Sequence, residues 1–438
     1  MKKYSLLLLI ALIVSLASAQ SDKRLKGIEQ EFEEILQATK APGFAVAIVE
    51  GDKVIYAKGF GYRDMENKIP VDENTLFAIG SCSKAFTCSV LGQLRDEDKI
   101  DFDDSPIKYI PELRFYNENL NSNINIQDLM CHRTGIPRHD VSWYLFTTDD
   151  KDNLIKRIQY QEPFTGLRQQ WYYNNFMFLV QGVVAERITG KSWEENIRQR
   201  FFKPLGMERS NLSIDELTKS ANAALGYELK HDSIISKMPY YNIAAMGPAG
   251  SINSSAKEMA NWLITWVNKG EFNGEQVLPE AYVQEAMTSH AVITGALPSE
   301  ENPDMHLANY GYGWMISSYR GHYRVEHGGN IDGFSASTAF FPSDSIGIVQ
   351  SNGSAFRRQG KYGCRQDAQN HPYRLGAKID YQSGEEQRSS RNSQGRGGSG
   401  KSRQQQAFAP DAGLQRFILL GLWAALRSAA GGFPLCPV

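Results

Sequence analysis

The strongest constraint on the fold is a pair of β-hairpin patterns that lie far apart in the chain. The β-rich runs 44–49 and 54–57 flank one short turn segment, and the runs 334–341 and 346–350 flank another. Such pairs of runs around a turn that contains Gly, Asp, Pro or Ser are typical of antiparallel hairpins. The segment 322–329 precedes the second pair as a further candidate strand.

Helical patterns fill the region between the hairpins. Residues 82–94 carry an apolar stripe, residues 177–188 are apolar and precede Gly190, and the capping box 255–258 opens another helix. Strand patterns at both ends with helices between them predict an α+β fold. We expect one antiparallel β-sheet built from both chain ends, flanked by helices, with a mostly helical inserted region.

The first nineteen residues differ in composition from the rest of the chain. Lys2 and Lys3 precede the apolar run 6–16, and the small residues 17–19 follow it. This order is typical of a cleaved signal peptide, and the apolar run is too short to span a membrane comfortably. We therefore expect residues 1–19 to be removed. The mature protein should be periplasmic or secreted, without stable membrane insertion.

The chain changes character again after about residue 355. Its last part, 356–438, is polar and rich in Gly, Ser, Arg and Gln, with one short apolar run at 417–426. Low-complexity polar segments cannot bury enough apolar surface to fold. Residues 356–438 are therefore expected to be a disordered or frameshifted tail, and residues 20–355 to form the folded domain.

The charge and the cysteines exclude several classes of protein. The formal net charge is −2, which implies no general attraction to nucleic acid. The five cysteines are odd in number and irregularly spaced, unlike a disulfide framework. The sequence contains no zinc-binding spacing and no other cluster of metal ligands. We expect no metal, no cofactor and no nucleic-acid partner.

The first candidate for chemistry is the segment GSCSKAF, in which Lys84 follows Ser81 by three residues. Ser-x-x-Lys occurs three times in the chain. Helix capping explains the other two, because Ser105 precedes Pro106 and Ser254 stands at the capping box. A cap would also explain Ser81 taken alone. One helical turn would nevertheless bring Ser81 and Lys84 together, and a lysine of lowered pKa can remove a serine proton.

Serine chemistry also needs a second proton carrier and an oxyanion site, and two further segments could supply them. Tyr-x-Asn occurs at 172–174, 173–175 and 240–242, where the tyrosine could carry a proton and the asparagine could bind a carbonyl. The segment 326–330, EHGGN, ends a candidate strand with two glycines, which let the backbone approach a ligand. Aromatic core packing and a tight strand end are the alternative explanations.

Three segments of the chain, taken together and in this order, resemble the three motifs of the β-lactamase-related serine hydrolases: GSCSKAF, YYNNFMFLVQG and EHGGNIDGF. This superfamily includes class C β-lactamases, D-alanyl-D-alanine carboxypeptidases, D-aminopeptidases and esterases. The resemblance covers roughly residues 25–353, and the segments LMCHRTGIPRHD, FKPLGM and GPAGSINSSAKEMANWL agree with it. The family's spacing selects the register 173–175 for the second motif, followed by Phe178 and Gly182. The implied fold is β-lactamase/transpeptidase-like.

The resemblance implies a catalytic group of three residues, Ser81, Lys84 and Tyr173. Ser81 would attack a carbonyl and become acylated, and Lys84 would help to deprotonate it. Tyr173, with its pKa lowered beside Lys84, would exchange protons with the serine and the leaving group. The backbone N–H groups of Ser81 and Asn330 would form the oxyanion hole.

The resemblance also implies a substrate-binding group: Asn175, His327, Gly328, Gly329 and Asn330. Asn175 would orient the substrate. His327 stands where true β-lactamases carry the lysine of their Lys-Thr-Gly motif, and a histidine is mostly neutral above a pKa of about 6.5. Recognition of a substrate carboxylate should then be weak or pH-dependent, and β-lactamase activity should be weak or absent.

These observations predict a secreted serine hydrolase that acts through an acyl-serine intermediate on a small-molecule or peptide substrate. The bond attacked would be a peptide, amide or ester, and a D-amino-acid peptidase or an esterase is favoured over an efficient β-lactamase. The alternative is a penicillin-binding or sensor module that becomes acylated but does not turn over, since the same residues serve both steps. The oligomeric state is left open.

Overall fold

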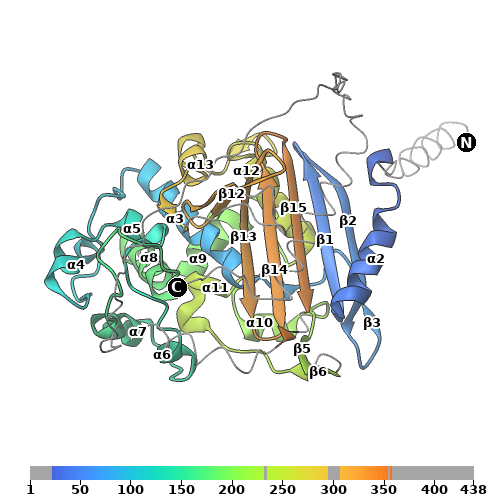
Figure 1. The fold of residues 1–438 in the computed structure, drawn as a ribbon, viewed down its shortest axis with the longest axis horizontal. Coiled ribbons are helices and arrows are strands. Elements are labelled where there is room, and N and C mark those ends of the chain that lie inside the picture. The colour runs from blue at the N-terminus through green and yellow to red at the C-terminus, as the bar shows by residue number, and fades with distance from the viewer. Residues whose placement is uncertain (1–21, 231–233, 294–305, 354–355, 358–438) are drawn as a thin grey trace, which may run out of the picture.

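The computed structural model describes residues 22–230, 234–293, 306–353 and 356–357. Within these residues, the main feature is a nine-stranded sheet in which neighbouring strands run antiparallel (Figure 1). Its strands follow the order β10 (Ala291–Val292), β11 (Ala308–Tyr310), β12 (Met315–Tyr319), β13 (His322–Ile331), β14 (Phe334–Phe341), β15 (Ile346–Gly353), β1 (Gly43–Glu50), β2 (Lys53–Asp64) and β3 (Ile69–Pro70).

Strands from distant parts of the chain meet in this sheet. β1 pairs with β15 along its whole length, with Val46 opposite Gln350, and β15 continues through β14 to β13. β1 also pairs with β2, so the early and late hairpins become neighbours (Figure 1). The predicted α+β fold with one antiparallel sheet built from both chain ends is confirmed. β2 continues to Asp64, beyond the predicted hairpin end at residue 57.

Both faces of β1 are buried, because alternate side chains of a strand point to opposite sides. One set packs against helix α2 (Ile28–Thr39): Phe44, Val46 and Ile48. The other set lies in the main core with helix α12 (Ala256–Val267): Ala45, Ala47 and Val49. The sheet therefore has helices on both sides at this strand, as predicted.

The region between β3 and β10 is mostly helical, also as predicted (Figure 1). Its α-helices are α3 (Ser83–Asp96), α4 (Glu118–Asn123), α5 (Ile126–Met130), α6 (Val141–Tyr144), α7 (Lys151–Arg157), α8 (Asn175–Thr189), α9 (Trp193–Ile197), α10 (Ile214–Lys219), α11 (Gly247–Gly250), α12 and α13 (Glu280–Ala286). Its short strands pair as β4 (Phe77–Ala78) with β7 (Asn253–Ser254), β5 (Gly226–Lys230) with β6 (Ile234–Met238), and β8 (Glu271–Phe272) with β9 (Glu275–Gln276). α3, α8 and α11 contact one another.

Two predicted helix caps have different outcomes. Ser105 caps the short 3-10 helix that begins at the next residue, as predicted. Ser255 accepts a hydrogen bond from the backbone N–H of Glu258 at the start of α12. The Glu258 carboxylate, however, accepts from the backbone of Arg209 and Ser210 at 2.8 Å each instead of returning to Ser255. The predicted capping box is therefore only half formed.

The predicted signal peptide, residues 1–19, lies outside the described residues. So does the predicted tail, apart from Phe356–Arg357, which form strand β16 and pair in parallel with β5. These two residues therefore join the fold, whereas we expected them in the tail. The domain limits 20–355 stay a prediction. Among the helices that the structure describes, none has the length and apolar character needed to cross a membrane.

Candidate active site

Ser81 lies in a short 3-10 helix, η2 (Gly80–Cys82), that leads directly into α3. Its side chain is partly exposed. The capping role that the sequence left open for Ser81 is wrong, since neither η2 nor α3 has a side-chain cap. The hydroxyl of Ser83, not that of Ser81, donates to the carbonyl of Gly80 at 2.7 Å. The Ser81 hydroxyl is therefore available for chemistry.

Lys84 is fully buried one helical turn after Ser81. Its Nζ lies 3.0 Å from Ser81 Oγ and donates to the carbonyl of Ala249 in α11 at 2.7 Å. Within the described residues, Lys84 has no ion-pair partner. Burial, and then the charge of Arg138, hold the pKa of Lys84 well below its ordinary value. A lowered pKa makes a neutral amine available as a base near neutral pH.

Tyr173 completes this cluster. Lys84 Nζ and the guanidinium carbon of Arg138 each lie 4.8 Å from the centroid of its ring, and the ring of His132 lies 4.4 Å away. Burial raises the pKa of Tyr173 well above its ordinary value, although Arg138 and a hydrogen bond with Ser81 act in the other direction. The expected lowering of this pKa is therefore wrong, because desolvation of the phenolate outweighs the nearby cation. Tyr173 keeps its proton at neutral pH and is suited to donate it.

Asn175 is the first residue of α8, and its side chain is buried. Its Nδ2 donates to Asp140 Oδ1 at 2.9 Å. Asp140 also accepts from Trp143 Nε1 at 2.9 Å and from Arg138 Nε at 2.6 Å. Asp140 thereby ties Asn175 to the loop that carries Arg138. The substrate-orienting role of Asn175 stays a prediction, and its amide is held in place for such a role.

His327 lies in β13 and is buried. Its Nδ1 lies 2.6 Å from the carbonyl oxygen of Gly328, which can only accept, so this nitrogen carries the proton. Its Nε2 then accepts from the hydroxyl of Tyr310 at 2.9 Å. Burial, followed by the charge of Lys84, lowers the pKa of His327 to about 3. The histidine is neutral across the physiological range, which favours weak over pH-dependent recognition of a carboxylate at this position. Carboxylate recognition itself stays a prediction.

This protonation behaviour gives a testable pH dependence. An unfolded histidine has a pKa of about 6.5, and folded His327 has a pKa of about 3. Between these values the unfolded chain binds more protons, so the folded state should lose stability as the pH falls from 6.5 towards 3. In the His327→Gln variant, the free energy of unfolding should fall less steeply as the pH is lowered. The slope should differ from that of the wild type by at most about 1.4 kcal/mol per pH unit, measured by unfolding in urea. His306→Gln, at an exposed histidine, is the control. If the stability of His327→Gln depends on pH as steeply as that of the wild type, the result would contradict a neutral, buried His327 imidazole.

Glycines let the end of β13 lie directly against the backbone of Ser81. A Cβ atom on Gly329 would come within 1.8 Å of the Ile79 carbonyl oxygen and 3.0 Å of the Ser81 nitrogen. A Cβ atom on Gly80, which has a φ of 51°, would lie 2.8 Å from the Asn330 nitrogen. Neither position accepts a larger residue without moving the backbone. The oxyanion hole stays a prediction, and both of its N–H groups belong to these touching segments.

Three residues near Tyr173 were not predicted as members of the site: His132, Arg138 and Asp140. His132 is buried, and its Nδ1 accepts from the backbone N–H of Asn174 at 3.1 Å. All three belong to the segment LMCHRTGIPRHD, which resembles the family. The charged residues in that segment were the available signal, but local patterns do not show which of its side chains reach the site.

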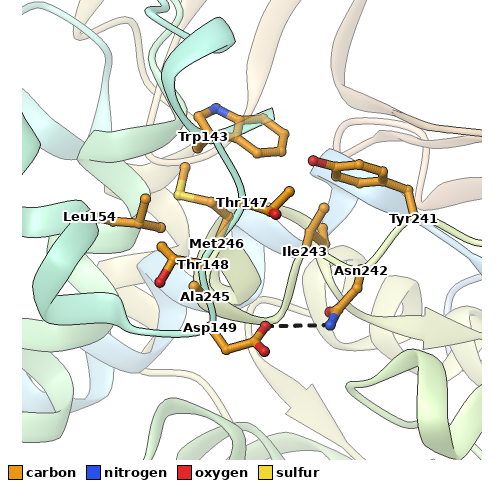
Figure 2. A pocket seen from close by; sticks show the side chains of 10 residues that line it. All are labelled: Trp143, Thr147, Thr148, Asp149, Leu154, Tyr241, Asn242, Ile243, Ala245 and Met246. Carbon is orange, nitrogen blue, oxygen red and sulfur yellow. Dashed lines mark hydrogen bonds between the residues drawn. The ribbon is translucent and has the colours of Figure 1, made fainter. Parts of the chain in front are cut away.

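A cavity of about 380 Å³ lies beside this network (Figure 2). Trp143 lines the cavity and also donates to Asp140, so the cavity and the Asn175 side of the site share a wall. Asn242 and Asp149 form a hydrogen bond of 3.4 Å at its edge. A volume of this size suits a small ligand group. In the described parts of the chain, no group of three or more metal-ligating side chains occurs.

The chain matches a known protein family over most of its length. A family model described as Beta-lactamase matches residues 28–361. The chain belongs to the beta-lactamase family. The resemblance inferred from the three motifs is therefore confirmed.

Two curated relatives have similar sequences. The unguisins hydrolase ungD' of Aspergillus campestris is 29% identical over 338 residues, which cover 74% of this chain and 61% of the relative. Protein flp of Staphylococcus aureus is 25% identical over 324 residues, with 74% of this chain and 61% of the relative covered. The chain thus spans about three fifths of the length of these relatives.

Solved structures share the fold. The octameric penicillin-binding protein homologue from Pyrococcus abyssi has a TM-score of 0.67 at 24% identity, covering 76% of this chain and 74% of that chain. The D-stereospecific amidohydrolase from Streptomyces sp. has a TM-score of 0.60 at 22% identity, covering 74% and 94%. At such identities the likeness concerns the fold, and it confirms the expected β-lactamase/transpeptidase-like architecture.

Proposed function

We propose that this beta-lactamase-family protein is a serine hydrolase in which Ser81 is the nucleophile and Lys84 its base. The observation that carries the proposal is the 3.0 Å contact between Lys84 Nζ and Ser81 Oγ. The amine is fully buried and its pKa is held low. Burying an amine without a carboxylate partner disfavours folding, so such a position supports a chemical role.

The proposed reaction has two steps. In acylation, Ser81 Oγ attacks the carbonyl carbon while Lys84 takes the hydroxyl proton, and the leaving group departs with a proton from Tyr173 or Lys84. In deacylation, water attacks the acyl-Ser81 ester, gives a proton to the same groups, and the released Ser81 oxygen recovers its hydrogen. The N–H groups of Ser81 and Asn330 would stabilise the oxyanion in both steps.

The proposed substrates are peptides, amides or esters, with D-amino-acid peptides and simple esters favoured over β-lactams. Support comes from His327, which is neutral where the family's β-lactamases carry a lysine. Two similar proteins, the unguisins hydrolase ungD' and the D-stereospecific amidohydrolase from Streptomyces sp., have names that agree with this choice. The proposal includes export to the periplasm or the medium, based on the pattern of residues 1–19.

Repeated turnover distinguishes this proposal from a module that only becomes acylated. The purified protein should hydrolyse p-nitrophenyl acetate or a D-amino-acid p-nitroanilide many times per molecule, and nitrocefin more slowly, as followed by absorbance. One equivalent of product, together with a stable penicillin adduct by intact-mass spectrometry, would instead support the penicillin-binding or sensor alternative. Absence of both turnover and covalent labelling would contradict the two functions together.

A further inference from the structure

Arg138 places a positive charge beside the reacting groups. Its guanidinium carbon lies 4.8 Å from the ring centroid of Tyr173, and its side chain is 58% exposed. After burial, its charge is the largest influence that lowers the pKa of Lys84. The guanidinium is therefore close enough to act on the catalytic cluster, and the side chain that carries it is partly exposed to solvent.

Asp140 holds one edge of the guanidinium, and no hydrogen bond to the described residues occupies the other edge. Arg138 Nε donates to Asp140 Oδ2 at 2.6 Å, while Asp140 Oδ1 accepts from Asn175 and Trp143. No other hydrogen bond joins the guanidinium to the residues that the structure describes. Its Nη1 and Nη2 groups thus form a pre-oriented fork of donors, the geometry that binds a carboxylate with two parallel hydrogen bonds.

The other basic groups of the site do not offer a permanent charge. His327 is buried and neutral. Lys84 is buried, and its Nζ is occupied by Ser81 and Ala249. An arginine keeps its proton under all ordinary conditions. Arg138 forms an ion pair with Asp140 at 2.6 Å, which offsets part of its charge, but it is the member of this cluster that carries a permanent positive charge for an anion.

We propose that Arg138 binds a carboxylate of the substrate close to the scissile carbonyl, so that the protein prefers acidic peptides, amides or esters. This inference rests on the proposed function and narrows its substrate class. Because Asp140 holds both Arg138 and Asn175, the carboxylate would lie on the Asn175 side of Ser81. Either the acyl part or the leaving part of the substrate could carry it.

Matched esters test the preference. Mono-p-nitrophenyl glutarate and p-nitrophenyl valerate share a leaving group and differ by a carboxylate on the acyl part. The acetate ester of 5-hydroxy-2-nitrobenzoate carries the carboxylate on the leaving part, with p-nitrophenyl acetate as its neutral reference. The wild type should show a higher kcat/KM for at least one acidic ester than for its neutral reference. Arg138→Gln should lower that preference about 10- to 100-fold, and Arg138→Lys should lower it less.

The ratio of kcat/KM for an acidic ester to kcat/KM for its neutral reference separates carboxylate binding from the effect of Arg138 on the pKa of Lys84. Loss of the Arg138 charge also removes one cause of the lowered pKa of Lys84, and this effect acts on all esters alike. Arg187→Gln is the matched control, because Arg187 pairs with Glu112 at 45% exposure near the far end of α8. It should leave the ratio unchanged. An Arg138→Gln variant that keeps the wild-type ratio, or a wild type without any preference, would overturn the proposal.

Equilibrium binding gives a readout that needs no turnover. Glutaranilic acid and its uncharged carboxamide would be titrated calorimetrically into the wild type and Arg138→Gln. Tighter binding of the acid by the wild type alone supports the proposal, and equal binding of the two compounds contradicts it. If this difference in binding is found while none of the esters is turned over, the proposed hydrolase function fails and the carboxylate site stands.

Discussion

Ser81→Ala should lower the turnover of every substrate by about 10⁴-fold or more, because it removes the atom that forms the proposed acyl intermediate. The fold should be kept, since the Ser81 side chain is partly exposed and does not cap a helix. The measurements are kcat/KM with an activated ester and intact mass after reaction with a phosphonate probe. The wild type should gain one adduct and the variant none.

Ser105→Ala is the matched control for this result. Ser105 belongs to a second Ser-x-x-Lys segment, and its hydroxyl caps a short helix. Its loss should cost about 0.5–2 kcal/mol of stability and leave kcat/KM unchanged. A Ser81→Ala variant with near wild-type turnover, or a phosphonate adduct that persists in it, would show that another residue is the nucleophile.

Lys84→Met should lower turnover by about 10³-fold or more and at the same time stabilise the fold. Methionine matches the length of the lysine stem but cannot take the Ser81 proton. It also removes a buried ionisable group that has no ion-pair partner in the described structure. The hydrogen bonds to Ser81 and Ala249 are lost, which offsets part of the gain. We expect a net increase of roughly 1 kcal/mol in the free energy of unfolding, measured in urea.

The stability gain of Lys84→Met should depend on pH. Folding lowers the pKa of Lys84, so between the folded value and the ordinary value of 10.5 the unfolded chain binds more protons. The stability contributed by this group therefore rises with pH and is lost as the pH falls. The advantage of the methionine variant should be largest at low pH and shrink as the pH approaches 10.5. A constant advantage, or a less stable variant, would contradict this account.

Lys108→Met provides the comparison. Lys108 is the lysine of the segment that contains Ser105, its side chain is 59% exposed, and it pairs with Asp104. Surface changes of this kind usually alter stability by less than about 0.5 kcal/mol. The activity of Lys108→Met should be unchanged. Of these two lysines, only Lys84 should combine a loss of activity with a gain of stability when it is replaced by methionine.

Features of the fold and site that depend on short-range spacing could be predicted from sequence. Alternation and turn residues identified the hairpins that became β1–β2 and β14–β15, and a three-residue spacing correctly brought Lys84 to Ser81. The family resemblance supplied the order of the motifs, and it selected Tyr173 for the site. These inferences need only local geometry or a shared pattern.

Features that depend on the surroundings of a side chain could not be predicted in this way. The pKa of Tyr173 rises because segments distant in sequence bury it, and His327 is kept neutral by burial among such neighbours. The positions of Arg138 and Asp140 follow from contacts between a loop and the start of α8. Desolvation and loop conformation are properties of the assembled structure, so residue types alone do not reveal them.

The pairing of β1 with β15, and the contact of Gly329 with the backbone around Ser81, have a consequence for the order of synthesis. The ribosome makes the turn that carries Ser81 long before it makes β13 and β15. Until those strands emerge, the edge of β1 has no partner, and Ser81 lacks the neighbouring Asn330 backbone. A nascent chain therefore carries an incomplete reaction centre. If Ser81 acts as proposed, its activity begins only after the last strands have been translated and have paired.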